Sequence, residues 1–557
     1  MRVDKLTIGS PKDSPTHRFK NLKDITIDFD QDDWVTIVIG WNGTGKSNVL
    51  EALAVIFREL IDSRRSPKIE FAFVLKYRIG SGDLHRSVTI SHDPDEKEPF
   101  NIVVTFASLA EDAPALPPKR MRIGTFLKDD SNLPRYVFSY YSGESPRMGE
   151  IFAPYLQWYD EQLRKGRDPG LKRLFYALPV HSQFVLLAFL IGGSSAAESL
   201  LRDHLGIDPE DGFESVLFVL RQPPWPPHRD GDTRFWGARG VVSSFLDRLQ
   251  EVALAPINVQ RRVNTSLWNK TRLEFKYLYI KDIAALRQLV GDQPPGRFFR
   301  DLESTYVSQL VEEVRIKIKV DNGDGTVTFR ELSEGERQLL TVLGLLRFTA
   351  EEESLILLDE PDTHLNPKWS VKYLEFLRQF IGNTVNQQET SHVIMTTHNP
   401  IAIAELSLQQ VQILQTKIES GRRKVIVSFP DEHPRGMGYA SIVTSSMFGI
   451  ASQLDETTQL DLERQRQLAS REKLSADEAT ELDAVNARLD QLGFRFFFPD
   501  DEYSRYLKIR NQELERIFKT KNVEVLARRV VDMTLEEREN LARRLISTLE
   551  KDQENEA

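Results

Sequence analysis

The sequence predicts an α/β protein: a mixed sheet with flanking helices that carries a helical insertion and a helical C-terminal region. The first observation is a buried strand at 34–40 that leads through a glycine-rich turn into a helix with apolar residues on one face. The second is a later alternation that is typical of a parallel sheet covered by helices. Its order is helix, strand, helix and strand over 334–349, 354–359, 367–381 and 392–397.

Four segments are expected, because a chain of 557 residues is too long for one hydrophobic core. Short β-like runs between 68 and 140 predict an antiparallel sheet, and residues 25–29 alternate like a half-buried strand. A β-hairpin is expected around the Asn-Gly-Asp-Gly run at 322–325, and a helical hairpin over 455–490. The predicted boundaries give an N-terminal half of the sheet domain, a mainly helical insertion, a C-terminal half and a helical region for partner interaction: 1–150, 151–305, 306–450 and 451–557.

The amino-acid composition excludes several classes of protein and of site. The formal charge of -10 argues against a surface that is basic overall, so any nucleic-acid contact must come from local patches. The absence of cysteine excludes disulfides, thiol chemistry and zinc sites that need a sulfur ligand. The N-terminus lacks the apolar core of a signal peptide, and no window approaches about eighteen uninterrupted apolar residues. We therefore expect a cytoplasmic protein without membrane contact.

The stretch "GWNGTGKS" at 40–47 matches the phosphate-binding loop, between a strand and a helix as that motif requires. Its glycines let backbone N–H groups face phosphates, Lys46 can reach the β- and γ-phosphates, and Ser47 can ligate Mg²⁺. The alternative is a glycine-rich turn that merely resembles this loop. The predicted nucleotide-binding residues of this region are Gly40, Asn42, Gly43, Thr44, Gly45, Lys46, Ser47 and Asn48.

Two further strands end in polar side chains. "LILLDEPD" at 355–362 is a buried strand that ends in carboxylates, a costly arrangement unless a cation or a water needs them. Asp359 is placed to hold Mg²⁺ and Glu360 to activate the attacking water. "VIMTTHNP" at 393–400 brings His398 to the end of a neighbouring strand, where it can sense the γ-phosphate. The alternatives are an ordinary strand end before a helix cap and a structural histidine.

The stretch "LSEGERQLL" at 332–340 places Ser333 and Gly335 at the start of a helix, where amides and the helix dipole can bind an anion. The alternative is a simple capping box, with serine at the cap and glutamate three residues later. The glycine loop already binds the phosphates within one subunit, so a second anion-binding helix end is not needed there. It has a role if it binds ATP that is held by another copy of the chain.

Together these four stretches resemble the heads of ABC-type P-loop ATPases, in the branch of the chromosome-maintenance and recombination-repair (SMC/Rad50-like) enzymes. The resemblance covers about 1–60 and 320–405. It implies that "GWNGTGKS" is Walker A, "LSEGE" the signature and "LILLDE" Walker B. It also implies that "PDTHLNP" is the D-loop and "TTHNP" the switch-histidine loop. It implies a head-to-head homodimer, or a higher oligomer, with ATP and Mg²⁺ between Walker A of one subunit and Ser333 and Gly335 of the other. It also implies that Arg18, in "RFKN", contacts the nucleotide.

The family's Q-loop glutamine is not identifiable, and the region around Tyr141 and Ser142 is our candidate for it. The chain between Lys46 and Ser333 is too short for very long coiled-coil arms. The first sixty residues, "YYSGES" and "IVTSSMFGIASQLDETTQ" are similar to the ATPase subunit of Septu-type antiphage systems, including those attached to retrons. That similarity implies an ATPase that controls a separate HNH nuclease of the PtuB type and, in retron versions, contacts a reverse transcriptase with its RNA-linked DNA.

Two other functions are open at this point. One is a DNA repair or recombination ATPase whose closed heads grip duplex DNA. The other is an overcoming-lysogenization-type nuclease with a fused Toprim domain, but "VIVSFPDEHPRG" at 425–436 lacks the strand-end carboxylates of such a domain, so no nuclease site is expected in this chain. Three basic clusters could track phosphates or be solvated surface: 118–122, 260–272 and 421–424.

Overall fold

The structure is a computed structural model of the chain. It describes residues 1–29, 33–62, 64, 66–80, 85–106, 117–170, 172–192, 194–264, 270–320, 326–349, 353–381, 391–419, 422–450, 452–471, 473–494 and 501–556.

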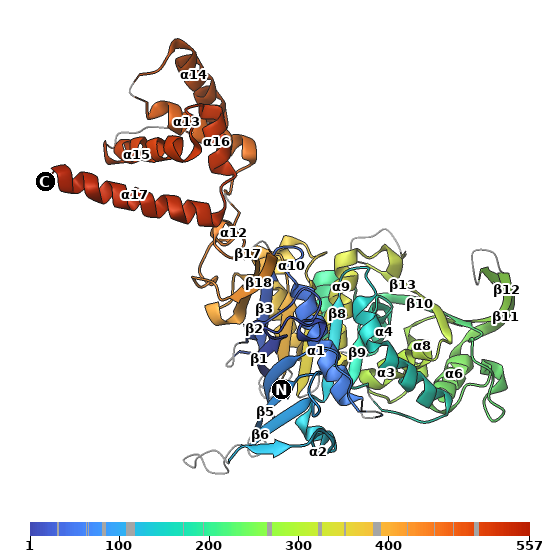
Figure 1. The fold of residues 1–557 in the computed structure, drawn as a ribbon. Coiled ribbons are helices and arrows are strands. Elements are labelled where there is room, and N and C mark those ends of the chain that lie inside the picture. Colours follow the sequence, from blue (N-terminus) through green and yellow to red (C-terminus); the bar gives the residue numbers. More distant parts are fainter. Residues whose placement is uncertain are drawn as a thin grey trace. The chain divides into compact units, whose positions relative to one another are not determined.

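The chain divides into two compact units, Met1–Phe429 and Pro430–Ala557 (Figure 1). The three sheets of the described residues lie in the first unit, and the described elements of the second unit are helices. Residues 430–450, which the sequence predicts to belong to the sheet domain, therefore fall in the second unit. The physical reason is the Pro- and Gly-rich stretch "PDEHPRGMG" at 430–438, which follows the last strand and cannot extend a sheet.

A seven-stranded sheet forms the centre of the first unit, in the order β18-β17-β3-β16-β15-β8-β9. All neighbouring pairs are parallel except the edge pair β17–β18, which confirms the predicted alternation of helices and strands. Every residue of β15 is buried, as expected for a strand covered on both faces. The bounds are β3 Val35–Gly40, β8 Tyr136–Tyr141, β9 Leu174–Tyr176, β15 Ser354–Asp359, β16 His392–Thr396, β17 Val411–Glu419 and β18 Arg422–Ser428.

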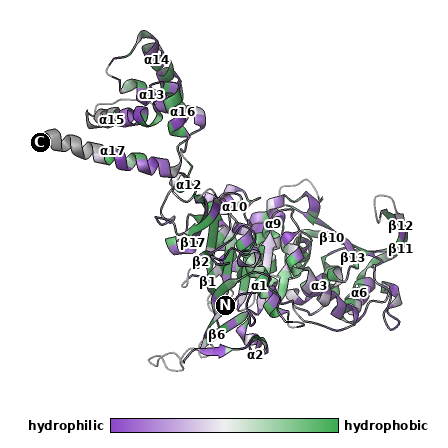
Figure 2. Cartoon of the chain, viewed as in Figure 1, coloured by the Kyte–Doolittle hydropathy of each residue, from purple (hydrophilic) through white to green (hydrophobic). Residues whose placement is uncertain are grey.

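A six-stranded sheet, in the order β2-β1-β4-β5-β6-β7, confirms the predicted antiparallel sheet. Helix α1 (Lys46–Ile61) contributes to one hydrophobic cluster with both sheets, and Figure 2 colours the central strands of this unit mostly green. This cluster holds the turn before α1 in a fixed place. The bounds are β1 Arg2–Ile8, β2 Ile25–Asp28, β4 Phe73–Ile79, β5 Arg86–His92, β6 Phe100–Phe106 and β7 Lys119–Met121.

Helices flank the seven-stranded sheet. Helix α9 approaches α4 so closely that a Cβ on Gly344 would lie 2.0 Å from Cγ1 of Val185, so only glycine fits there. Further α-helices of the first unit are α2 Ile123–Phe126, α3 Arg147–Arg164, α4 His181–Ile191, α5 Ser195–Ser199, α9 Glu334–Thr349 and α10 Pro367–Ile381. The short 3₁₀ and π turns are η1 Pro15–His17, η3 Asp130–Asn132, η4 Leu200–His204, η5 Thr233–Phe235, η6 Phe329–Glu331, η7 Pro400–Ile403 and η8 Leu408–Gln410.

A third sheet lies largely inside the segment 151–305, which the sequence predicts to be mainly helical. Its order is β11-β12-β10-β13-β14, and β13–β14 is the expected hairpin. Sequence reasoning missed β11 and β12 because their apolar residues are interrupted by arginine and lysine, which weakens the period-two signal. The bounds are β10 Phe213–Arg221, β11 Leu254–Asn264, β12 Lys270–Ile280, β13 Val311–Lys319, β14 Thr326–Thr328, α6 Gly240–Val252, α7 Ile283–Val290 and α8 Pro295–Val307.

The second unit contains the expected helical hairpin, α13 and α14, around the buried residues Leu462, Val485 and Leu489. Ser475 begins α14 with a capping box, which explains why the two helices are separated there. The bounds are α12 Tyr439–Thr444, α13 Glu456–Ala469, α14 Ala476–Gln491, α15 Asp501–Phe518, α16 Val523–Val531 and α17 Leu535–Glu556.

No single helix among the described residues is long and apolar enough to span a membrane; only α4 together with 195–204, at a bend of 112°, meets the length and composition limits.

Candidate functional site

The turn between β3 and α1 is shaped by its glycines. Gly45 caps α1 with φ of 102°, and a Cβ there would lie 2.6 Å from Leu22. A Cβ on Gly40 would lie 2.3 Å from the carbonyl oxygen of Leu414. Thr44 is buried and its hydroxyl donates to the Trp41 carbonyl at 2.8 Å, while Asn42 and Gly43 are exposed at the tip of the turn. The result is a tight loop whose backbone amides border the helix N-terminus, where negative charge is favoured.

Asp359 lies at the end of β15, directly opposite the first turn of α1. The Ser47 hydroxyl donates to Oδ1 of Asp359 at 3.1 Å, and the Thr396 hydroxyl of β16 donates to the same oxygen. Hydroxyl and carboxylate oxygens are the ligands that Mg²⁺ prefers in proteins. The structure therefore brings together the two residues predicted to hold the metal.

Glu360 lies between Lys46 and His398. Its Oε1 is 4.0 Å from Nζ of Lys46 and 3.5 Å from Nδ1 of His398. The backbone at Glu360 is left-handed, with φ of 51°, and its N–H donates to the Thr396 carbonyl at 3.1 Å. This strained turn aims the carboxylate away from the strand and toward the loop. Lys46, whose ammonium donates to the Gly40 carbonyl at 2.8 Å, closes the group.

Two matching family models bracket these residues. The model described as "AAA ATPase domain" matches residues 18–133, and the model described as "AAA domain, putative AbiEii toxin, Type IV TA system" matches residues 230–404. The first match contains the glycine loop with Lys46, and the second contains Glu360 and His398, which the fold joins into one site. Both parts of the site are thus similar to AAA-type ATPase domains.

Curated relatives match short parts of the chain. Septu protein PtuA of Bacillus mycoides (strain KBAB4) is 26% identical over 110 residues, which is 20% of this chain and 14% of the relative. The probable peptide export ATP-binding protein YydI of Bacillus subtilis (strain 168) is 30% identical over 80 residues, which is 14% of this chain and 37% of the relative. The alignments thus cover well under half of either relative.

A solved structure, "Crystal structure of the SmcHead bound to the C-winged helix domain of ScpA", aligns with 77% of this chain and 98% of the solved one. The sequence identity is 13% and the TM-score is 0.28.

The predicted signature segment begins α9. Ser333 and Glu336 exchange hydrogen bonds in a capping box, the geometry of the plainer alternative, and Ser333 stays exposed. A Cβ on Gly335 would lie 2.6 Å from the His364 carbonyl oxygen, so the D-loop packs directly against the signature. No hydrogen bond or ion pair joins Ser333 or Gly335 to Lys46, Glu360 or His398 among the described residues. Their contact with a nucleotide stays a prediction.

The Q-loop candidate lies beside Asp359, the predicted metal ligand. The Ser142 N–H donates to the Asp359 carbonyl at 3.2 Å, and the Ser142 and Thr363 hydroxyls are 3.3 Å apart. Strand β8, which ends at Tyr141, pairs with β15 in parallel register. Because parallel strands end at the same edge of a sheet, the sequence could place this region near Asp359 without identifying a contact residue.

A charged group beside this loop escaped sequence analysis. Glu51 of α1 is buried and forms ion pairs with Lys20 and, at 3.5 Å, with Arg147. The Arg147 guanidinium also lies over the Tyr141 ring, 5.7 Å from its centre. Glu51 therefore links α1 to the N-terminal segment and to the Q-loop candidate. The sequence signal that could have identified Glu51 was its position one helical turn after Ser47. A glutamate at that position is more often exposed to solvent, so the spacing alone did not single it out.

The N-terminal segment reaches the glycine loop through Asn21. Its Nδ2 donates to the Gly43 carbonyl at 3.1 Å, and the Asn48 amide donates to Oδ1 of Asn21 at 2.6 Å. Arg18 is exposed three residues earlier, so its predicted contact with the nucleotide stays a prediction.

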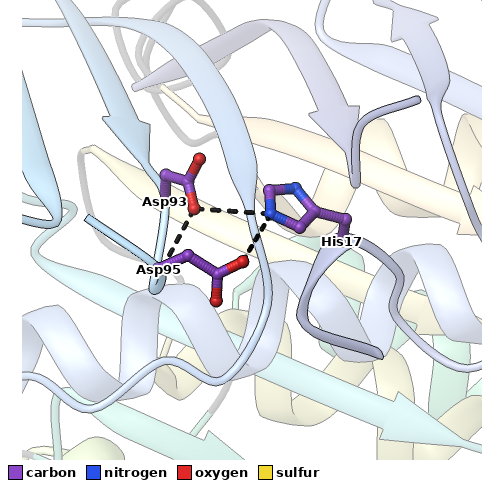
Figure 3. A group of neighbouring side chains, drawn as sticks. All are labelled: His17, Asp93 and Asp95. Atoms are coloured by element: carbon purple, nitrogen blue, oxygen red, sulfur yellow. Dashed lines mark hydrogen bonds and ion pairs between the residues drawn. The ribbon is translucent and has the colours of Figure 1, made fainter. Parts of the chain in front are cut away.

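Just before Arg18, the buried His17 points at the carboxylates of Asp93 and Asp95 (Figure 3). Its Nε2 is 3.0 Å from Asp95 and 3.5 Å from Asp93, within the spacing of metal ligands. The Lys12 ammonium also lies 3.0 Å from Asp93. It offsets the negative charge that would otherwise attract a metal ion. We interpret the group as a brace that holds the N-terminal segment against the six-stranded sheet.

The buried Asp359 carboxyl is expected to make the melting temperature depend on pH. Burial is the main cause that raises its pKa, opposed by hydrogen bonds from Thr396 and Ser47. The stability that this group contributes is present below its ordinary pKa and is lost as pH rises through the raised folded pKa. Asp359→Asn should therefore raise the melting temperature of the nucleotide-free protein by roughly 1–3 °C at neutral and higher pH. The gain should shrink as pH falls through the folded pKa.

Scanning calorimetry across pH checks this prediction. The same variant should lose the additional stabilisation that Mg²⁺ with ATP gives the wild type, because a neutral amide is a poorer metal ligand. A gain in melting temperature that does not depend on pH would contradict the role assigned to burial of the charge.

Proposed function

We propose that this chain is the ATP-binding and ATP-hydrolysing regulatory subunit of a Septu-type antiphage defence system, which dimerises around ATP and controls an HNH nuclease on another chain. The ATPase part rests on one observation, the convergence of Ser47 with Asp359 and of Lys46 with Glu360 and His398. The defence part is supported by the similarity to the Septu protein PtuA. A cytoplasmic location stays a prediction.

The residues of this site divide the work of hydrolysis. Lys46 and the loop amides bind the phosphates, and Ser47 with Asp359 would hold Mg²⁺, which supplies charge neutralisation at the β- and γ-phosphates. Burial lowers the pKa of Lys46, while Glu360 and Asp359 oppose that effect. Glu360 orients the water and takes up its proton. His398, which is exposed beside Glu360, is placed to hold the water or the γ-phosphate.

The second half of each site comes from another copy in this proposal. Ser333 and Glu334 at the start of α9 are exposed, and the first turn of a helix favours an anion. ATP between two heads would join this helix start to the glycine loop of the opposite subunit. Binding then favours a closed dimer and hydrolysis an open one, so the nucleotide state can decide whether an effector is held or released.

A plaque assay with the neighbouring gene tests the proposed function. An adjacent HNH-nuclease gene is expected, with or without a gene for reverse transcriptase. Co-expression of both chains should lower phage plating, whereas either chain alone, or the pair with Glu360→Gln, should not. The matched control is the pair with Glu375→Gln, an exposed residue of α10 that should keep full protection.

Two results would overturn the defence assignment. One is protection by this chain alone. The other is resistance to DNA damage, without phage protection, conferred by this chain and lost with Glu360→Gln, which would favour a repair ATPase that clamps DNA.

A further inference from the structure

The five-stranded sheet leaves one face open to solvent. Along β13, buried valine and isoleucine residues alternate with exposed cations, which are Arg315, Lys317 and Lys319. Helices α6, α7 and α8 contact β12, β10 and β13, so they cover the face that carries the buried residues. The cations lie on the opposite face.

Aromatic and apolar side chains share this open face with the cations. Leu217 of β10 pairs with Arg315 on one side and with Tyr279 on the other, so the three residues point the same way. The next strand places Leu254 opposite Tyr279 and Ile257 opposite Tyr277. Tyr279, Leu254 and Ile257 are 37%, 56% and 55% exposed, which is unusual for neighbouring large apolar residues.

The charges on the open face are predominantly positive. Glu313 forms ion pairs with Arg315, at 2.8 Å, and with Arg330, so two cations offset this one carboxylate. Arg261 donates to the Tyr277 hydroxyl at 2.8 Å and lies 5.2 Å from the Phe275 ring centre. In a chain with a formal charge of -10, this local excess of cations beside tyrosines is a specific feature.

We propose that this open face binds single-stranded nucleic acid. Unpaired bases can stack on Tyr279 and Tyr277 or on the apolar floor beside them, while Lys317 and Lys319 contact phosphates. A duplex would offer phosphates but no free base faces, so it would leave the tyrosines unused. The cation excess favours a polyanion over a protein strand. Among the described side chains of the basic cluster 260–272, Arg261 lies on this face, whereas Arg262 and Arg272 pair with each other on the other side.

Fluorescence anisotropy with labelled oligothymidine of about 16 nucleotides tests the proposal on the full chain without ATP. The Lys317→Ala/Lys319→Ala variant should reduce the slope of log affinity against log salt by roughly 1.4, which corresponds to two phosphate contacts on a single strand. Tyr279→Ala should weaken binding roughly fivefold or more and leave the salt slope unchanged. A duplex of the same length should bind more weakly and be insensitive to Tyr279→Ala.

The matched control is Arg262→Ala/Arg272→Ala, which removes two cations from the other face of the same strands. It should change neither affinity nor slope. Equal loss in this control, an unchanged slope in the lysine variant, or a drop in native mass caused by Tyr279→Ala would each overturn the proposal, the last by indicating a second copy on the face. Basal ATP hydrolysis and melting temperature are measured for every variant, so failure here is distinguishable from failure of the ATPase.

Discussion

The Glu360→Gln variant should bind ATP with wild-type affinity, lose hydrolysis by roughly 100-fold or more, and accumulate as a closed dimer with ATP. Glutamine keeps the size of the side chain beside Lys46 and His398 but cannot accept a proton from water. The phosphate-binding atoms of the loop are untouched, so binding and turnover should separate. Phosphate release, nucleotide binding and native mass with ATP are the measurements.

The control for this experiment is Glu375→Gln, which removes an equivalent charge from the exposed side of α10. It should hydrolyse ATP at the wild-type rate. Normal turnover in Glu360→Gln would refute the role of Glu360. Loss of ATP binding in that variant would instead indicate that the carboxylate mainly supports Lys46.

Two inactive variants should restore each other when mixed. Lys46→Ala removes the phosphate-binding ammonium, and Ser333→Arg fills the start of α9 with a bulky cation. A mixed dimer has one intact site, formed by the loop of the Ser333→Arg subunit and the helix start of the Lys46→Ala subunit. With free subunit exchange and independent sites, an equal mixture should recover about a quarter of the wild-type rate.

The matched control for mixing is Lys46→Ala with Glu360→Gln. Both changes fall in the same half of the composite site, so each mixed dimer has two defective sites and the mixture should stay inactive. Recovery in this control, or wild-type hydrolysis by Ser333→Arg alone, would contradict ATP shared between two copies.

Local patterns were sufficient for the centre of the fold. The strands that end in Gly40, Asp359 and Thr396 are short, strongly apolar and bounded by polar turns, so their positions and their common edge could be predicted. The convergence of Ser47, Glu360 and His398 followed from that edge. Glu51 could not be assigned, because its partners Lys20 and Arg147 come from distant segments that the sequence does not place beside α1.

The third sheet was missed for a different reason. In β11 and β12 one face is open to solvent and carries apolar and charged residues together, so the usual alternation of buried apolar and exposed polar positions is blurred. The same mixed composition is the basis of the nucleic-acid proposal.

Strand β14 leads through η6 and Leu332 straight to Ser333, with no intervening loop. Arg330, which pairs with Glu313 on the open sheet face, is thus three peptide bonds from the serine that faces the opposite subunit's ATP in our proposal. Such a short connection, held by a turn, allows little independent movement of the two segments. Nucleic acid bound to the sheet would therefore shift the equilibrium between the open and closed dimer. By thermodynamic reciprocity, ATP would change the affinity of the sheet for nucleic acid by the same factor by which nucleic acid changes the affinity for ATP.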